Sequence, residues 1–327
     1  RFRHSFPTRR SSDLKLITIS ILFTIATGIV YFINRFIFAT ATLKQMLKFT
    51  ANNYYHWRFG KIFYKKKGTG SPLLLIHDLT IYSSSYEWNS LIDKLSENHT
   101  VYVLDLPGCG RSDKQKLTYT NYLYVQAITD FIKNVIQEKT DVITSGFSAT
   151  FTLLACHNEN DLFGKILMIN PPAPGTLNKV PGKRSKLCKF VLEIPVFGTL
   201  IYNMITCQSN IQLLFTEQYL YNPFSIKPEW LDIYYEAAHK GMSNSKYLYS
   251  SIIGRYTNNS ISHAIKELNN SLYILEGQGE ENKEDVLNQY TEYNSAIETF
   301  VLKGSKHLPQ LESPEQLLEQ LLIFLDD

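Results

Sequence analysis

Ser148 and His307 are the residues whose types and order point most directly to chemistry. Ser148 stands in Gly-Phe-Ser-Ala-Thr, directly after the short apolar run 141–145 and before a stretch expected to be helical. A serine hydroxyl is a weak nucleophile until a neighbouring base takes its proton. His307 suits that task because the unperturbed pKa of imidazole, about 6.5, lies near neutral pH. The pattern predicts a serine nucleophile held on a sharp turn between a strand and a helix.

Glu280 is an acid close to the end of a late expected strand. It ends the sequence Gly-Gln-Gly-Glu after the run 271–275, and Glu281 and Asp285 are acids nearby. A carboxylate that holds the second nitrogen of a catalytic imidazole stabilises the imidazolium ion. The histidine lies in Gly-Ser-Lys-His-Leu-Pro at 304–309, close before the last expected helix.

The elements that must position these residues alternate between strands and helices, which predicts an α/β, doubly wound and mostly parallel sheet. Continuous apolar runs read as strands buried on both faces, at 72–76, 100–104, 141–145, 165–169 and 271–275. A hairpin-like turn is expected at 65–70. Between 173 and 262 no strand is expected, and segments rich in Tyr, Phe and Leu predict a helical cap inserted between the core parts 52–172 and 263–327.

With the Gly-rich loop 105–113 and the His-Asp-Leu tip at 77–79, these motifs resemble the α/β-hydrolase superfamily, in its capped branch of esterases, peptidases and C–C hydrolases. The resemblance runs from about residue 64 to the C-terminus. It implies a catalytic triad of Ser148, Glu280 and His307. It also implies an oxyanion hole made by the backbone N–H groups of Leu79 and Ala149. Because serine occupies the predicted nucleophile position, the Asp-based dehalogenase and epoxide-hydrolase chemistries of this superfamily are not expected.

Two residues depart from the family pattern. Asp78 stands where the family usually has Gly, and Thr150 replaces the last Gly of the nucleophile motif. An acid at 78 would either repel an oxyanion or be turned away and held by local hydrogen bonds. His77 is interpreted as a structural residue.

The N-terminal region reads as a foreign segment followed by a membrane helix. Residues 1–14 resemble a translated sequencing adapter, and we interpret them as an assembly artefact. No charge occurs between Lys15 and Arg35, which is about the 20 residues that a bilayer-spanning helix needs. Residues 15–39 are therefore predicted to form an N-terminal transmembrane anchor, with a signal segment as the alternative. The sequence does not decide which side of the membrane the domain faces.

The overall composition narrows the function classes. The chain has 327 residues and a formal net charge of only +3, so nucleic acid is not expected as a partner, and no cofactor motif is found. We expect a membrane-anchored serine hydrolase that cleaves a carboxylic ester of a small-molecule acyl substrate through an acyl-enzyme on Ser148. The alternatives are an aminopeptidase resembling proline iminopeptidase and a non-catalytic binding protein that retains the hydrolase fold.

Overall fold

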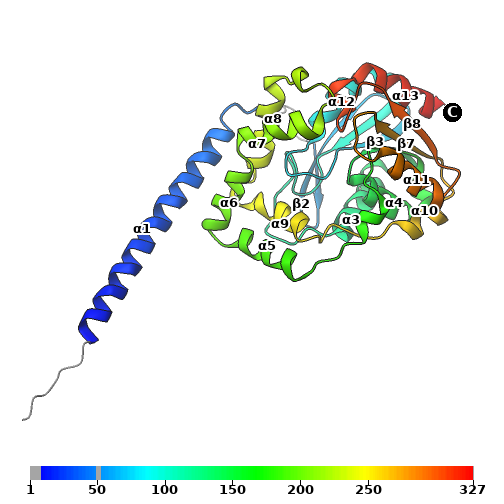
Figure 1. Cartoon of the computed structure of the whole chain (residues 1–327). Helices are drawn as coiled ribbons and strands as arrows, with labels where there is room; N and C mark the ends of the chain where they lie inside the picture. Colours follow the sequence, from blue (N-terminus) through cyan, green and yellow to red (C-terminus); the bar gives the residue numbers. More distant parts are fainter. Residues whose placement is uncertain (1–8, 49–52, 327) are drawn as a thin grey trace, which may run out of the picture.

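The computed structural model describes residues 9–48 and 53–326 (Figure 1). Positions 1–8 of the predicted adapter segment lie outside the described residues, as does residue 52 at the start of the predicted core. The boundaries predicted for the adapter segment, core and cap stay predictions.

Eight strands form one sheet in the order β1-β2-β4-β3-β5-β6-β7-β8. The strands are β1 Tyr54–Trp57, β2 Gly60–Lys67, β3 Ser71–Ile76, β4 His99–Leu104, β5 Thr140–Ser145, β6 Phe163–Ile169, β7 Leu272–Gly277 and β8 Glu298–Leu302. From β4 to β8 every neighbouring pair is parallel, whereas β1 with β2 and β2 with β4 are antiparallel. The predicted mostly parallel α/β sheet is confirmed. The expected hairpin at 65–70 is wrong, because β2 continues through the lysines to pair with β4 rather than with β3.

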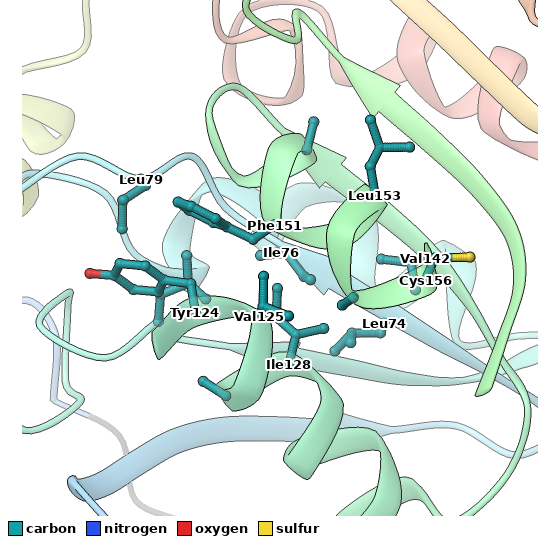
Figure 2. Packing of buried hydrophobic residues seen from close by; sticks show 14 of the residues in the cluster. Leu74, Ile76, Leu79, Tyr124, Val125, Ile128, Val142, Phe151, Leu153 and Cys156 are labelled. Carbon is teal, nitrogen blue, oxygen red and sulfur yellow. The ribbon is translucent and has the colours of Figure 1, made fainter. Parts of the chain in front are cut away.

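Helices cover both faces of the sheet. The helices of the core are α2 Asn89–Leu95, α3 Asn121–Phe131, α4 Ser148–Asn158, α10 Ser262–Glu267, α11 Lys283–Tyr293, α12 Pro309–Glu312 and α13 Pro314–Asp326. Buried side chains of α2 and α13 pack on one face, and those of α3, α4, α10 and α11 pack on the other. Figure 2 shows the second face, where Tyr124 of α3 stacks on Phe151 of α4 at 4.8 Å between ring centroids. This packing fixes the start of α4 against the ends of the central strands.

A helical insertion lies between β6 and β7, as expected. We call α5 to α9 the cap; its helices are α5 Lys183–Glu193, α6 Phe197–Ile205, α7 Gln208–Leu214, α8 Pro228–His239 and α9 Lys246–Ile253. Aromatic residues of α8 and of the turn after α7 form a third buried cluster, which includes Trp230, Tyr234, Phe215 and Tyr219. Leu308, next to the predicted catalytic histidine, belongs to the same cluster. The cap is thereby packed directly on the histidine loop.

Helix α1, Arg9–Ala41, carries the predicted anchor. Its part Asp13–Ala41 is long and apolar enough to cross a membrane, a property that signal sequences and some core helices share. The N-terminal half projects away from the domain, and the helix contacts α6 and α8 (Figure 1). Near the end of the helix, Asn34 is buried, donates to the carbonyl of Val196 at 2.9 Å and accepts from Asn203 at 2.9 Å. The helix is therefore docked on the cap at one end and exposed along the rest.

Candidate active site

The candidate site lies where several parallel strands end at the same edge of the sheet. Asp78 follows β3, Gly146 follows β5, Glu280 follows β7 and His307 follows β8. Carboxyl ends of parallel strands meet at one edge, and ligands of open α/β sheets bind there. The topology thus gathers residues that are up to 229 positions apart in the chain.

His307 lies between two carboxylates. Its Nδ1 is 3.0 Å from Oε1 of Glu280, and its Nε2 is 3.2 Å from Oδ2 of Asp78. Burial alone would lower the pKa of His307, but the hydrogen bonds and charges of Asp78 and Glu280 raise it to about 10. Tyr219 of the cap stacks on the imidazole, with ring centroids 5.2 Å apart. The histidine is therefore held as an imidazolium ion with both nitrogens engaged.

The structure brings His307 and Glu280 together, and their catalytic roles stay predictions. Neither alternative acid, Glu281 or Asp285, has a recorded hydrogen bond to the imidazole within the described residues. Glu281 lines the nearby pocket, and Asp285 lies in the first turn of α11.

The structure does not bring Ser148 to His307. Ser148 is fully buried as the first residue of α4, and its hydroxyl donates to the carbonyl oxygen of His77 at 2.6 Å. The turn between β5 and α4 is made instead by Gly146, whose φ is +56°. The tip of the turn is thus Gly146, and the role of Ser148 as the nucleophile stays a prediction. The turn requires a small residue two positions after its tip, and Ser148 is that residue when the tip is Gly146. Thr150 then lies outside the positions that must be small.

The position of the turn at Gly146 also bears on which backbone N–H groups could stabilise an oxyanion. The N–H of Ala149 donates to the carbonyl of Gly146 at 3.2 Å, inside the turn, so it is not directed at a substrate. The N–H that follows the tip belongs to Phe147, and it donates to Oδ1 of Asp78 at 2.6 Å. The role of Ala149 as an oxyanion donor stays a prediction, and Phe147 is a second candidate donor. The role of Leu79, which is buried next to Asp78, stays a prediction.

The carboxyl group of Asp78 fills the space that a side chain at the tip would occupy. A Cβ atom built on Gly146 would overlap Cγ and Oδ1 of Asp78. One oxygen of Asp78 meets the Phe147 N–H and the other faces His307. The loop after β3 thus supplies the functional group that β5 would normally present. The sequence had identified Asp78 as a departure, but not as the group at the centre of the site.

Gly146→Ala is expected to destabilise the protein and to displace Asp78. A left-handed backbone costs a non-glycine residue about 1–2 kcal/mol, and the overlap with Asp78 adds to that. Gly304→Ala is a matched control, because Gly304 has a φ of +66° and open space around its Cβ position. In urea unfolding we expect Gly146→Ala to lose more stability than Gly304→Ala. Equal losses in the two variants would contradict this packing of Asp78.

Two further buried acids lie near the site. Burial raises the pKa of Glu87 to about 7 and that of Glu276 to about 8. Glu87 accepts a hydrogen bond from Tyr234 at 3.0 Å. Protonation at neutral pH limits the negative charge that these two acids add around Asp78 and Glu280. His77 accepts from the N–H of Leu106 at 3.0 Å and contacts the Asp78 carbonyl at 2.6 Å, which is the structural role that the sequence predicted.

A pocket of about 440 Å³ opens onto these groups. Its lining residues come from the core and from the cap: Asp78, Thr80, Glu217, Gln218, Tyr219, Glu280, Glu281, Lys306 and His307. The volume suits a small organic molecule.

Comparisons with known proteins agree with this fold. A model of the alpha/beta hydrolase family matches residues 73–320. A soluble epoxide hydrolase of Corynebacterium sp. (strain C12) is 24% identical over 110 residues, which is 34% of this chain and 38% of that protein. An uncharacterized protein of Mycobacterium bovis is 25% identical over 103 residues, 32% of this chain and 30% of that protein. The matches thus span well under half the length of these relatives.

Solved structures with similar folds cover most of the chain. A serine hydrolase involved in carbazole degradation has a TM-score of 0.69 at 14% identity, covering 84% of this chain and 98% of its own. The epoxide hydrolase CorEH has a TM-score of 0.68 at 18% identity with the same coverage. A membrane phospholipase A, described as a bacterial virulence factor, has a TM-score of 0.66 at 16% identity and covers 96% of this chain and 98% of its own. At these identities the likeness concerns the fold.

Proposed function

Because the chain belongs to the alpha/beta hydrolase family, we propose that it is a hydrolase in which Asp78, rather than Ser148, attacks the substrate. The observation that carries this proposal is the position of the Asp78 carboxyl group. It fills the side-chain space of the tip residue Gly146, between the Phe147 N–H and His307. A carboxylate held in this place has one oxygen stabilised by the Phe147 N–H and the other directed at His307, which also lines the pocket.

The chemistry of a carboxylate favours one substrate class. Attack of a carboxylate on an ester would form an anhydride and expel a far more basic alkoxide, so the adduct would revert to the ester. Attack on a strained or activated alkyl carbon forms a stable ester instead. We therefore propose an epoxide of a small molecule as the substrate. The similarity to a soluble epoxide hydrolase over 110 residues supports this choice.

In the first step, Oδ2 of Asp78 attacks an epoxide carbon, a new C–O ester bond forms, and a C–O bond of the ring breaks. The alkoxide that results takes the Nε2 proton of the His307 imidazolium. The raised pKa of His307 keeps this proton available at neutral pH. The products of the step are a neutral imidazole and a hydroxyalkyl ester of Asp78.

In the second step, neutral His307 takes a proton from water while the water oxygen attacks the carbonyl carbon of the Asp78 ester. The tetrahedral oxyanion accepts a hydrogen bond from the Phe147 N–H. Glu280 stabilises the imidazolium ion of His307, which forms again in this step. Collapse breaks the bond between the carbonyl carbon and the alkyl oxygen. The diol leaves with the second water proton, and Asp78 returns to a carboxylate. The net reaction is epoxide plus water to a vicinal diol.

The sequence-based prediction of ester cleavage through an acyl-enzyme on Ser148 has less support. The Ser148 hydroxyl is buried and already donates to the His77 carbonyl. His307 also has its Nε2 directed at Asp78 and its pKa raised, so it is a poor base toward serine at neutral pH.

Ser148→Ala distinguishes the two mechanisms. We expect its turnover of a panel of terminal and internal epoxides to stay within about threefold of wild type, at a cost of about 1 kcal/mol in unfolding free energy for the lost hydrogen bond. Neither protein should react with a fluorophosphonate probe. Labelling of the wild type that disappears in Ser148→Ala would restore the serine mechanism. A wild type that turns over neither epoxides nor esters would favour the non-catalytic alternative.

We further propose that α1 anchors the domain in a membrane. Its side chains between positions 16 and 33 are mostly exposed and apolar, which water disfavours. The membrane phospholipase A with a similar fold covers 96% of this chain, including most of α1. An anchored enzyme would meet apolar epoxides that partition into the bilayer.

A further inference from the structure

The junction between α1 and the cap contains a second cavity, remote from Asp78 and His307. It has an inner lobe of about 340 Å³ and an outer lobe of about 450 Å³. Arg35, Phe38 and Met242 line both lobes. No acidic side chain lines either lobe among the residues that the structure describes.

The inner lobe gathers three cations, from Arg35, Lys116 and Lys246. Their recorded contacts are to uncharged groups. The Arg35 guanidinium reaches the sulfur of Met242 at 3.7 Å, and the Lys116 ammonium lies 5.9 Å from the centroid of the Tyr247 ring. Lys246 donates to the carbonyl of Ile194 at 2.9 Å and to the hydroxyl of Thr199 at 3.1 Å. The lobe is therefore lined by cations and by no carboxylate among the described residues.

Lys246 shows how unfavourable this charge is without a counter-ion. Burial lowers the pKa of Lys246 to about 8. The carboxylate of Glu193 raises this pKa, and the charge of Lys116 lowers it by a smaller amount. Glu193 is itself paired with Lys189. An anion in the lobe would stabilise the charged form of the buried Lys246 side chain.

The wall of the inner lobe is strained. Val196 has a φ of +62° and Met242 a φ of +52°, and both line the lobe. A left-handed backbone is especially unfavourable for a β-branched residue, and such strain persists where neighbouring contacts impose it. Here the carbonyl of Val196 is held by Asn34 of α1. The shape of the lobe thus depends on the docking of the anchor against the cap.

The position of the lobe along α1 places it at the level of a membrane surface. The charge-free run 16–34 forms about 28 Å of helix, close to the hydrocarbon thickness of about 30 Å, so Arg35 would lie at the headgroup level. Below it, Phe197 of the cap contacts Phe23 of α1 at 5.9 Å between ring centroids. Exposed apolar side chains continue along α5 and α6, namely Leu187, Phe190, Ile201 and Met204. Acyl chains would find apolar surface directly beside the cationic lobe.

We propose that the inner lobe binds the phosphate group of an anionic phospholipid from the leaflet next to the domain, with its acyl chains along α1 and α6. The proposal rests on the proposed membrane anchor but not on the chemistry of Asp78. Arg35 and Lys116 would contact the phosphate, because their side chains have no acidic partner among the described contacts.

The test is native mass spectrometry of the full chain in an uncharged detergent, titrated with dioleoyl phosphatidylglycerol or dioleoyl phosphatidylcholine. We expect one phosphatidylglycerol per chain, bound at least tenfold more tightly than phosphatidylcholine. The double variant Arg35→Gln with Lys116→Gln should weaken phosphatidylglycerol binding by about fivefold for each charge removed. Lys44→Gln is the matched control, since Lys44 is paired with Asp232 outside both lobes, and it should change binding by less than twofold.

Each contrary outcome has a separate meaning. Equal affinity for the two lipids, or equal losses in Lys44→Gln and the double variant, would overturn the site. Displacement by millimolar glycerol phosphate would assign the lobe to a soluble phosphate and overturn the lipid proposal. Failure of the wild type to float with vesicles would overturn both the anchor and the site. Asp78→Asn should bind phosphatidylglycerol like the wild type whether or not Asp78 is the nucleophile.

Discussion

Asp78→Asn is expected to lower turnover by at least about 10⁴-fold, the scale seen when a nucleophile is removed from a cooperating set. The amide oxygen of Asn can still accept the Phe147 N–H, so the loop should keep its place, but an amide is too weak a nucleophile to open an epoxide. The measurement is kcat for the best substrate of the epoxide panel, together with urea unfolding to verify the fold.

Asp141→Asn is a suitable control for this variant. Asp141 also accepts a backbone N–H, from Lys165 at 2.7 Å, but it lies at the opposite end of β5. Its turnover should stay within about twofold of wild type, as expected for a site away from the chemistry. Near-normal turnover in Asp78→Asn would remove Asp78 from the reaction.

His307→Gln is expected to slow epoxide turnover by about 10³-fold, because it removes both the proton donor of the first step and the base of the second. A primary alkyl bromide needs no proton on its leaving group, so with this probe the ester of Asp78 should still form and then accumulate. Peptide mass spectrometry would find the alkyl group on Asp78 in His307→Gln and much less of it in the wild type. His157→Gln, at a half-buried histidine that is paired with Glu267 and lies outside the site, should behave like the wild type.

The charge of His307 also gives a pH dependence. Its pKa is raised from 6.5 to about 10 in the folded protein, so its contribution to stability is full below about pH 6.5 and is lost as pH rises through about 10. Between pH 7 and pH 10 the free energy of unfolding should fall more in the wild type than in His307→Gln. Turnover of epoxides should fall over the same alkaline limb. Parallel stability curves in the two proteins would contradict the imidazolium between Asp78 and Glu280.

Much of the architecture could be predicted from the sequence because burial leaves a clear pattern. Continuous apolar runs such as 72–76 mark strands covered on both faces, and the absence of such runs marks the helical insertion. His307 and Glu280 could be paired because each follows a strand that ends at the same sheet edge. The two residues are expected to lie close together because the strands of the predicted parallel sheet all end at this edge.

The register of the turn after β5 could not be fixed in the same way. A tip at Gly146 would have Thr144 and Ser148 two positions away, and a tip at Ser148 would have Gly146 and Thr150. Both registers therefore place fairly small residues beside the tip. Only the backbone shows that the left-handed residue is Gly146. One signal was available: the expected strand ended at 145, so a tight turn would place its tip at the next residue.

The role of Asp78 could not be predicted for a related reason. With serine taken as the nucleophile, Asp78 was expected either to repel the oxyanion or to be turned away and held by local hydrogen bonds, and carboxylate chemistry was not expected. A glycine at the tip and an acid on the facing loop are complementary changes, because the carboxyl group of Asp78 needs the space that Gly146 leaves. The relation between Asp78 and Gly146 becomes apparent only when the positions of the loops after β3 and β5 are known.

The most direct test of this account is a single turnover in water enriched in ¹⁸O, with enzyme in excess over the best epoxide. If Asp78 attacks, the new hydroxyl oxygen of the diol comes from its carboxylate. The diol should therefore contain ¹⁶O, and the peptide that carries Asp78 should gain ¹⁸O, as mass spectrometry would measure. A diol labelled with ¹⁸O in the first turnover, with no label in Asp78, would contradict the central claim and indicate direct attack by water.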